Sequence, residues 1–115
     1  MTIVIYHNPR CSKSRSTLEL LKSRGIQPKI VEYLKTPPSA AELEDILRKL
    51  GLKPRDLMRK KEAPYAALGL DDPKLSDDAL IRAMVENPVL IERPIVVNGD
   101  RAALGRPPEA VLAIL

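Results

Sequence analysis

The chain contains a single cysteine, Cys11, and basic residues surround it in the sequence: Arg10, Lys13 and Arg15. The segment joins a short apolar run, typical of a β-strand, to a longer run with helical spacing of its leucines. A thiol at such a turn lies at a helix N-terminus, where unpaired backbone amides and the helix dipole favour an anion. Both this position and the basic side chains lower the pKa of a thiol. The pattern therefore predicts a nucleophilic cysteine.

The alternative is that Cys11 is a small buried residue of the core, which is the commoner role of a lone cysteine. A core cysteine usually has apolar neighbours, whereas the neighbours here are a proline, basic residues and serines. This composition favours the chemical role. One cysteine also excludes an internal disulfide, a Cys-x-x-Cys redox pair and a cysteine-rich zinc site. With one histidine and one cysteine in the chain, we expect no metal site.

The bulk composition fits one small domain, because the chain has 115 residues and 44% of them are hydrophobic. No apolar run approaches the ~20 residues that span a bilayer, and the first apolar run ends too early for a signal peptide. We therefore expect a cytoplasmic protein with no membrane partner, and a monomer. The net charge of +4 is spread along the chain, and there is no Phe or Trp. Nucleic-acid binding is thus disfavoured, whereas binding of a small anion is not.

The expected elements follow the order β-α-β, a block of helices, and β-β-α, which predicts an α/β fold. A right-handed crossover makes the first two strands parallel, and Asn98-Gly99 is a hairpin signature. Together these parts form a thioredoxin-like mixed four-stranded sheet with flanking helices. We expect one domain over residues 1–115, with a helical insertion at about 37–86. The expected strands are residues 2–6, 29–33, 95–97 and 101–104, and the clearest expected helix is 12–24.

Local signals predict where several helices begin and end. Ser39 and Glu42 form a capping box, and Gly51 ends the helix that follows. Short helices are expected at 54–60 and 63–68, and Ser76 caps a further one. Pro107 stands where a proline at the first helical position is expected, before the C-terminal helix.

Three arginines outside the Cys11 segment stand at positions where they could take part in its chemistry. Arg93 precedes Pro94, and Pro94 opens the strand at 95–97. X-Pro bonds adopt cis at a cost of only about 0.5–1 kcal/mol, so Pro94 is a candidate cis-proline that places Arg93 beside the Cys11 loop. Arg106 lies in a loop before a proline, and Arg59 lies in the helical block. The alternative for each arginine is a solvated surface charge, and spacing alone does not bring the three together.

Four separated segments resemble the glutaredoxin-coupled arsenate reductase family, a group of ArsC-like proteins in the thioredoxin-like superfamily that is related to Spx-type proteins. The resemblance covers essentially the whole chain, and the order of elements is the same. Its segments are His7-Asn8-Pro9-x-Cys11-x-x-Ser14-Arg15, Leu57-Met58-Arg59-Lys60, Glu92-Arg93-Pro94-Ile95-Val96-Val97 and Gly105-Arg106-Pro107-Pro108-Glu109.

The resemblance implies that the protein reduces arsenate to arsenite, with glutathione as co-substrate, glutaredoxin as partner and no bound cofactor. It implies Cys11 as the nucleophile and three oxyanion-binding arginines, Arg59, Arg93 and Arg106. It also implies that the thiolate is tuned by three loop residues, His7, Ser14 and Arg15. This chemistry is coherent, because guanidiniums bind a tetrahedral dianion through paired hydrogen bonds. One cysteine cannot supply two electrons and end in an internal disulfide, so an external thiol is required.

Other functions stay open at this point. A Cys-x5-Arg phosphatase also binds an oxyanion with a thiolate, but the first arginine after Cys11 is Arg15 and no glycine-rich cradle follows. Spx-type regulators contact RNA polymerase and usually carry a Cys-x-x-Cys switch, in which Ser14 would replace the second cysteine. A glutathione-dependent thiol oxidoreductase acting on another substrate is a third possibility. His7 is equally compatible with a loop histidine satisfied by the backbone.

Overall fold

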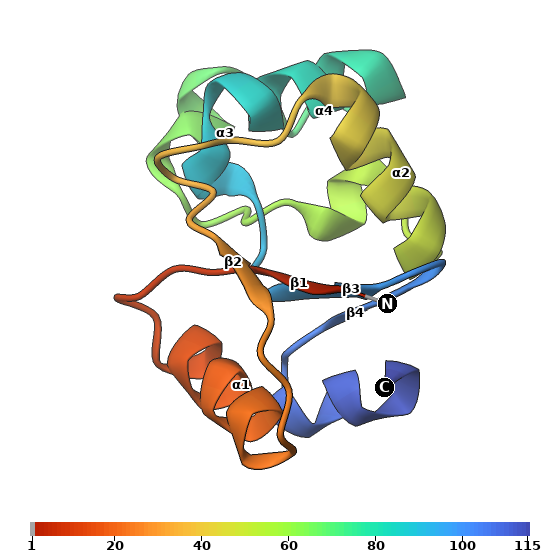
Figure 1. Ribbon diagram of the computed structural model, residues 1–115. Coiled ribbons are helices and arrows are strands. Elements are labelled where there is room, and N and C mark those ends of the chain that lie inside the picture. Colours follow the sequence, from red (N-terminus) through yellow and green to blue (C-terminus); the bar gives the residue numbers. More distant parts are fainter. Residues whose placement is uncertain (1) are drawn as a thin grey trace. The chain divides into compact units, whose positions relative to one another are not determined.

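The structure, a computed structural model, describes residues 2–115 of the chain. The chain divides into two compact units. The first unit contains the residues up to Thr36 together with Arg93–Leu115, and it holds the whole β-sheet (Figure 1). The second unit, Pro37–Glu92, is helical. No helix within residues 2–115 combines the length and the hydrophobicity needed to cross a membrane.

The sheet of the first unit has four strands in the order β2-β1-β3-β4. Its strands are β1 (Ile3–Tyr6), β2 (Lys29–Val31), β3 (Ile95–Asn98) and β4 (Arg101–Leu104). β1 is a central strand, parallel to β2 and antiparallel to β3, with Ile5 opposite Val96. β3 and β4 form the predicted hairpin, in which Gly99 supplies the left-handed backbone at φ 61°. The predicted mixed four-stranded sheet is therefore confirmed.

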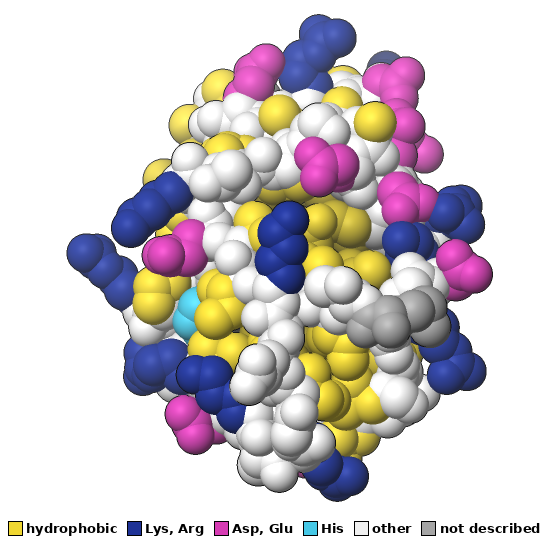
Figure 2. All heavy atoms as spheres, viewed as in Figure 1, with side chains coloured by type: hydrophobic (Ala, Val, Ile, Leu, Met, Phe, Trp, Pro, Cys, Tyr) yellow, Lys and Arg dark blue, Asp and Glu magenta, His cyan; other side chains and the backbone are white. Residues whose placement is uncertain are grey.

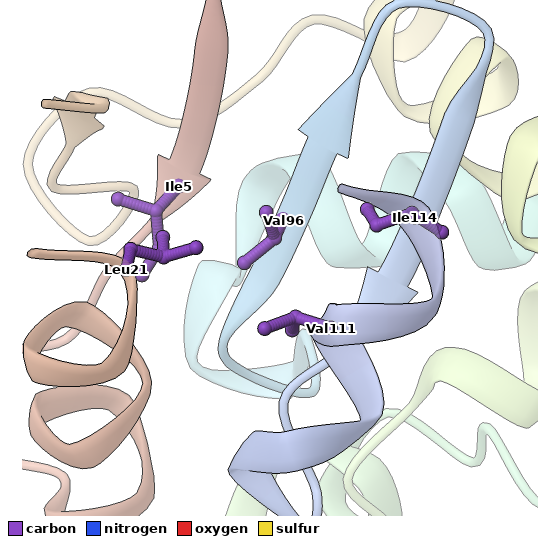
Figure 3. Close-up of a cluster of buried hydrophobic side chains, with 5 residues drawn as sticks. All are labelled: Ile5, Leu21, Val96, Val111 and Ile114. Atoms are coloured by element: carbon purple, nitrogen blue, oxygen red, sulfur yellow. The ribbon is translucent and has the colours of Figure 1, made fainter. Parts of the chain in front are cut away.

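Helix α1 (Ser12–Ser23) and the 3-10 helix η3 (Pro108–Ile114) cover the same face of this sheet (Figure 1). Between them lies a cluster of buried side chains, which Figure 3 shows: Ile5, Leu21, Val96, Val111 and Ile114. Burying a side chain of this size contributes about 1.5–3 kcal/mol relative to leaving it exposed. The buried stripe of α1 is Ser14, Thr17 and Leu21. Leu21 thus anchors α1 in the core. The other end of the buried stripe is Ser14, which is close to Cys11 in the chain.

The C-terminal helix differs from the prediction in both its type and its start. Pro107 is not its first residue, because Pro107 has an extended backbone with ψ 166° and η3 begins at Pro108. A residue that precedes a proline is sterically excluded from the helical region. Two consecutive prolines therefore shift the start by one residue.

The second unit consists of helices whose ends follow the predicted signals. Its elements are α2 (Ala40–Leu50), η1 (Pro54–Leu57), α3 (Ala63–Ala67), α4 (Asp77–Glu86) and η2 (Pro88–Leu90). The capping box is confirmed, since the Glu42 N–H donates to Ser39 Oγ at 3.1 Å and the Ser39 N–H donates to Glu42 Oε1 at 3.0 Å. The Ala79 N–H likewise donates to Ser76 Oγ at 3.1 Å. α2 ends at Gly51, whose backbone is left-handed with φ 69°.

The second unit extends beyond the insertion expected at 37–86. The Arg59 N–H donates to the Leu90 carbonyl at 2.7 Å. Met58 and Ile91 form an antiparallel β-bridge. These contacts tie the chain that follows α4 to the chain that follows η1, so the unit ends only at its last residue before Arg93.

Two elements are shorter than the sequence pattern predicts by at least two residues. The strand expected at 29–33 ends at Val31, because the chain then turns and the Lys35 N–H donates to the Glu32 carbonyl at 2.9 Å. The helix expected at 54–60 is the 3-10 turn η1, which ends at Leu57. In both places an apolar pattern continues past the last residue of the regular element.

Candidate functional site

Cys11 lies in the loop that leaves the central strand β1, and it is the N-cap residue of α1. Its N–H donates to the Asn8 carbonyl at 3.0 Å, which closes the turn. Among the residues that the structure describes, no side chain caps α1, and its first turn holds no acidic residue. We call this region, Cys11–Ser14, the open start of α1. Its backbone amides are available to an anion, and the thiol stands where that anion would be.

Burial raises the pKa of the Cys11 thiol, since the side chain is only 8% exposed, yet the pKa lies below the ordinary value. The first opposing cause is a hydrogen bond from the Ser14 backbone N–H, and the Lys13 N–H adds a second. The positive charges of Arg93 and Arg106 also favour the thiolate. Cys11 is thus buried like a core cysteine but is electrostatically prepared to act as a nucleophile.

The charges that lower this pKa do not come from the basic side chains next to Cys11 in the sequence. Arg10 and Arg15 are exposed, and Arg15 Nη1 donates to the Pro9 carbonyl at 3.0 Å. Lys13 acts on the sulfur through its backbone N–H. The prediction that these three side chains supply the charge is therefore wrong. Arg15 instead binds the backbone of the loop that holds Cys11.

Ser14 and His7 are both buried beside the Cys11 turn, at 0% and 6% exposure. His7 Nδ1 lies 2.6 Å from Ser14 Oγ, and the Asn8 N–H donates to the same oxygen at 3.0 Å. Burial lowers the pKa of His7; the charge of Glu32 opposes this effect, and nearby cations reinforce it. The neutral imidazole is therefore favoured. His7 is bonded to a side chain, and that side chain belongs to the residue whose N–H donates to the Cys11 sulfur.

Arg93 and Arg106 are brought together in the first unit by the start of β3 and the end of β4. The Arg93–Pro94 peptide bond is cis, as the sequence predicted, and the Arg106–Pro107 bond is also cis. Arg106 Nη1 donates to the Arg93 carbonyl at 3.2 Å. Two guanidiniums that both act on the Cys11 sulfur suit a tetrahedral dianion, because their N–H groups form paired, charge-assisted hydrogen bonds.

Arg59, the third predicted arginine, belongs to the second unit and follows η1. Its Nη1 lies 2.9 Å from Glu62 Oε1, and both side chains are partly exposed. An oxyanion that binds Arg59 must compete with this carboxylate. Its role in oxyanion binding stays a prediction.

A cavity of about 200 Å³ adjoins the Cys11 loop in the first unit. Its lining residues come from that loop and from the segment after β2: His7, Asn8, Pro9, Arg10, Glu32, Leu34 and Lys35. The lining thus mixes cations, a carboxylate and apolar groups. Within residues 2–115, no group of three or more His, Cys, Asp and Glu residues is placed to hold a metal ion. Figure 2 shows Lys and Arg side chains interspersed with Asp and Glu side chains on one face of the molecule.

The comparisons with known proteins settle the family. A model of the ArsC family matches residues 6–114. The chain belongs to the ArsC family. An Escherichia coli K12 relative, "Uncharacterized protein YfgD", is 58% identical over 98% of this chain and 96% of its own length. A protein named arsenate reductase from Neisseria meningitidis serogroup B is 54% identical over 98% and 97% of the two chains. The solved structure of an arsenate reductase from Vibrio cholerae has a TM-score of 0.97 and 57% identity, and covers 100% of this chain and 98% of that one.

ArsC family membership confirms the resemblance that the four sequence segments carried. Two residues of the site escaped the sequence analysis. Thr17 and Gly105 meet behind the open start of α1, where a Cβ on Gly105 would lie 2.3 Å from Thr17 Oγ1. Gly105 stands in the Gly105-Arg106-Pro107 segment of the family pattern, and this position was its only signal. Thr17 reads in the sequence as an ordinary residue of an amphipathic helix.

Proposed function

We propose that this ArsC family protein is an arsenate reductase, with Cys11 as nucleophile, glutathione as co-substrate and glutaredoxin as protein partner. The observation that carries the proposal is the position of Cys11 at the open start of α1. There two backbone amides and two guanidiniums favour the thiolate. Relatives that share about half of this sequence and bear the name arsenate reductase support the same substrate.

In this proposal Arg93 and Arg106 bind the arsenate oxygens beside the sulfur. Each guanidinium presents N–H groups in a planar fork, which matches two oxygens of a tetrahedral anion. The contacts of Arg93 and Arg106 orient arsenic toward the Cys11 thiolate and neutralise the charge that would otherwise repel it. Arg59 stays the predicted third oxyanion-binding residue, and an oxyanion that binds it displaces the Glu62 carboxylate.

Each step of the proposed reaction forms one bond and breaks another. The thiolate attacks arsenic, a sulfur–arsenic bond forms, and an arsenate oxygen leaves as water after taking up protons. The thiol of glutathione next attacks the adduct. The sulfur–arsenic bond breaks, and its electron pair stays on arsenic, which passes from the +5 to the +3 state, while the two sulfurs join in a mixed disulfide and the glutathione proton passes to an arsenic-bound oxygen. One arsenate and two thiols thus yield arsenite, water and one disulfide.

The protein side of the cycle depends on how well Cys11 serves as thiolate and as leaving group. Ser14 donates its N–H to the sulfur, and its side chain is fixed by His7 and by the Asn8 N–H. His7 therefore acts as a positioning residue that holds Ser14 in place. Glutaredoxin, with further glutathione, reduces the mixed disulfide and returns Cys11 to the thiolate.

The test is an assay in which NADPH oxidation is coupled to arsenate through glutathione, glutaredoxin and glutathione reductase. We expect turnover that requires arsenate, glutathione and glutaredoxin, and that is lost in Cys11→Ser. The proposal fails if the wild-type protein, with Cys11 shown to be reduced, gives no arsenate-dependent oxidation. If Cys11 then still forms a mixed disulfide with glutathione, the protein is a thiol oxidoreductase that acts on another substrate.

A further inference from the structure

Three segments of the first unit meet at Gly105 so closely that no larger residue fits there. A methyl group on Gly105 would lie 2.3 Å from Thr17 Oγ1 and 2.7 Å from Pro94 Cγ. Both distances are shorter than van der Waals contact. Neither neighbouring side chain can easily rotate away, because Thr17 is β-branched and the side chain of Pro94 is closed in a ring. The Gly105 N–H also donates to the Pro94 carbonyl at 2.9 Å. Glycine is required here for close approach rather than for its backbone angles.

Thr17 links this contact to the turn that holds the sulfur. Its side chain is completely buried, and its hydroxyl donates to the Lys13 carbonyl at 2.8 Å. The Gly105 carbonyl lies 3.5 Å from the same hydroxyl oxygen. Lys13 is also one of the two residues whose N–H donates to Cys11 Sγ. One side chain therefore touches both the first turn of α1 and the loop that carries Arg106.

The residues in this contact are the direct chain neighbours of the two arginines. Arg93 precedes Pro94, and Arg106 follows Gly105. Arg106 Nη1 also donates to the Arg93 carbonyl. A shift at Gly105 therefore acts directly on the two chain segments that carry Arg93 and Arg106.

We propose that Thr17 and Gly105 are positioning residues, which hold Arg93 and Arg106 in place against the open start of α1. The geometry stands on the contacts above, whereas the consequence for oxyanion binding rests on the proposed function. Neither residue touches the reacting atoms. They act by fixing the distance between the sulfur and the charges that stabilise it.

The test compares Gly105→Ala with wild type by the pH dependence of Cys11 alkylation with iodoacetamide. Moving the guanidiniums away removes part of the charge that favours the thiolate, so the midpoint rises. We expect the fraction of the plateau rate that is reached at pH 7 to fall by about threefold or more. Thr17→Val, which keeps the shape but removes the hydroxyl, should give a smaller change in the same direction. Thr17→Ser, which keeps the hydroxyl, should stay nearest to wild type.

Gly25→Ala is the matched control for lost stability in the same unit. Gly25 follows α1 with φ 75°, and among the described residues nothing lies within 4 Å of a Cβ there. This variant is strained by its backbone but leaves the Cys11 turn untouched, so its alkylation midpoint should equal that of wild type. Equal midpoints for wild type and Thr17→Val, together with an unchanged midpoint in folded Gly105→Ala, overturn the proposal. If Gly105→Ala does not fold, the alkylation midpoints of the two Thr17 variants decide. A midpoint that is higher in Thr17→Val than in Thr17→Ser supports the proposal, and the absence of this difference overturns it.

In the double variant Thr17→Ala/Gly105→Ala, the smaller side chain at position 17 leaves room for the added methyl group on the α1 side. Its alkylation midpoint should therefore lie between those of Gly105→Ala and wild type. The readout is independent of arsenate, so it survives a failure of the proposed function. With arsenate as substrate, Gly105→Ala should raise KM more than it lowers kcat, since it displaces binding groups. An altered midpoint without arsenate turnover in wild type would uphold the positioning role and refute the reductase assignment.

Discussion

Helices α2 and α4 of the second unit begin in one way, and helix α1 of the first unit begins in another. In the second unit, α2 and α4 begin with capping serines, Ser39 and Ser76, and carry acidic residues in their first turns. In the first unit α1 begins with Cys11, lacks a side-chain cap within the described residues, and has no acid in its first turn. The amides that serine and carboxylate oxygens satisfy elsewhere are left for the sulfur. The same local physics thus stabilises a helix in one unit and a reactive anion in the other.

The comparison also shows what a helix start alone does not supply. α2 has the same amides as α1, but nothing in its first turn adds positive charge, and Glu42 adds a negative one. At α1, the two additional charges come from Arg93, just before β3, and from Arg106, just after β4. The reactive site therefore needs the sheet, whereas the capped helices need only their own residues.

The largest effect is expected from replacing the sulfur. Cys11→Ser should lower arsenate turnover by at least about a thousandfold, because serine forms no adduct with arsenic at neutral pH. Serine is itself a good N-cap, so the melting temperature should stay near that of wild type. The coupled assay and thermal unfolding measure the two outcomes. Turnover near the wild-type level would show that the start of α1 serves only as a helix start, as in α2 and α4, and that Cys11 is not the nucleophile.

The next effect concerns the arginines that the sheet brings to Cys11. Arg93→Lys and Arg106→Lys should each lower kcat/KM by about ten- to a hundredfold, the consequence of losing a charge-assisted hydrogen bond worth roughly 1.5–3 kcal/mol. Arg101→Lys, at an exposed position on β4, is the matched control and should be unchanged. Arg59→Lys asks whether the second unit takes part in the reaction. A loss equal to that of Arg93→Lys would extend the site to both units, and no loss would confine it to the first.

A thiol moved between the two kinds of helix start should change its character. In Cys11→Ser/Ser39→Cys the new thiol lies at the start of α2, next to Glu42 and outside the first unit. Its alkylation midpoint should lie close to that of a free thiol, about 8.5, and above the midpoint of Cys11 in wild type. Equal midpoints at the two positions would mean that a helix start is sufficient and that the arginines of the sheet are dispensable.

A smaller effect is expected from removing a cap in the second unit. Ser39→Ala should lower the free energy of unfolding by about 1 kcal/mol, because the Glu42 N–H loses its acceptor. Arsenate kcat and the alkylation midpoint of Cys11 should both stay at wild-type values. Chemical denaturation and the coupled assay provide the comparison. A clear drop in kcat would contradict the division of roles between the units.

The smallest effect is a change in acid stability at His7. Its pKa in the folded protein lies below the ordinary value of 6.5, because burial disfavours the charged imidazole. The stability that this neutral ring contributes is present above pH 6.5 and is lost as the pH falls through the lower folded value. His7→Asn should therefore flatten the dependence of unfolding free energy on pH below 6.5. An identical acid profile in the variant would show that His7 titrates as it does in the unfolded chain.

The sequence predicted the parts of the fold whose signals are local. The Ser39–Glu42 capping box, the glycine that ends α2 and the Asn98-Gly99 turn each depend on a few adjacent residues, and each lies where it was predicted. Pro107 is an instructive error, because the correct rule was available. The proline after it excludes a helical backbone, and this local effect outweighs the preference for proline at the first helical position.

The site was less accessible to sequence reasoning, because its electrostatics are tertiary. Arg10, Lys13 and Arg15 are close to Cys11 along the chain, but the structure assigns the charge to Arg93 and Arg106. The candidate cis-proline Pro94 pointed to Arg93, whereas only the family resemblance pointed to Arg106, since spacing cannot bring distant arginines together. Gly105 gave no conformational signal, because the need for glycine there comes from Thr17 and Pro94 rather than from a turn.

The open start of α1 also gives the protein a preference among its own covalent states. In the thiolate state the amides of Lys13 and Ser14 and the two guanidiniums face an anion. In a mixed disulfide the sulfur is neutral, and these groups lose the partner that the fold provides for them. A thiol with a lowered pKa is also the better leaving group in exchange. The feature that starts the proposed reaction therefore shortens the life of its last intermediate, and it favours return of the enzyme to the form that binds the next oxyanion.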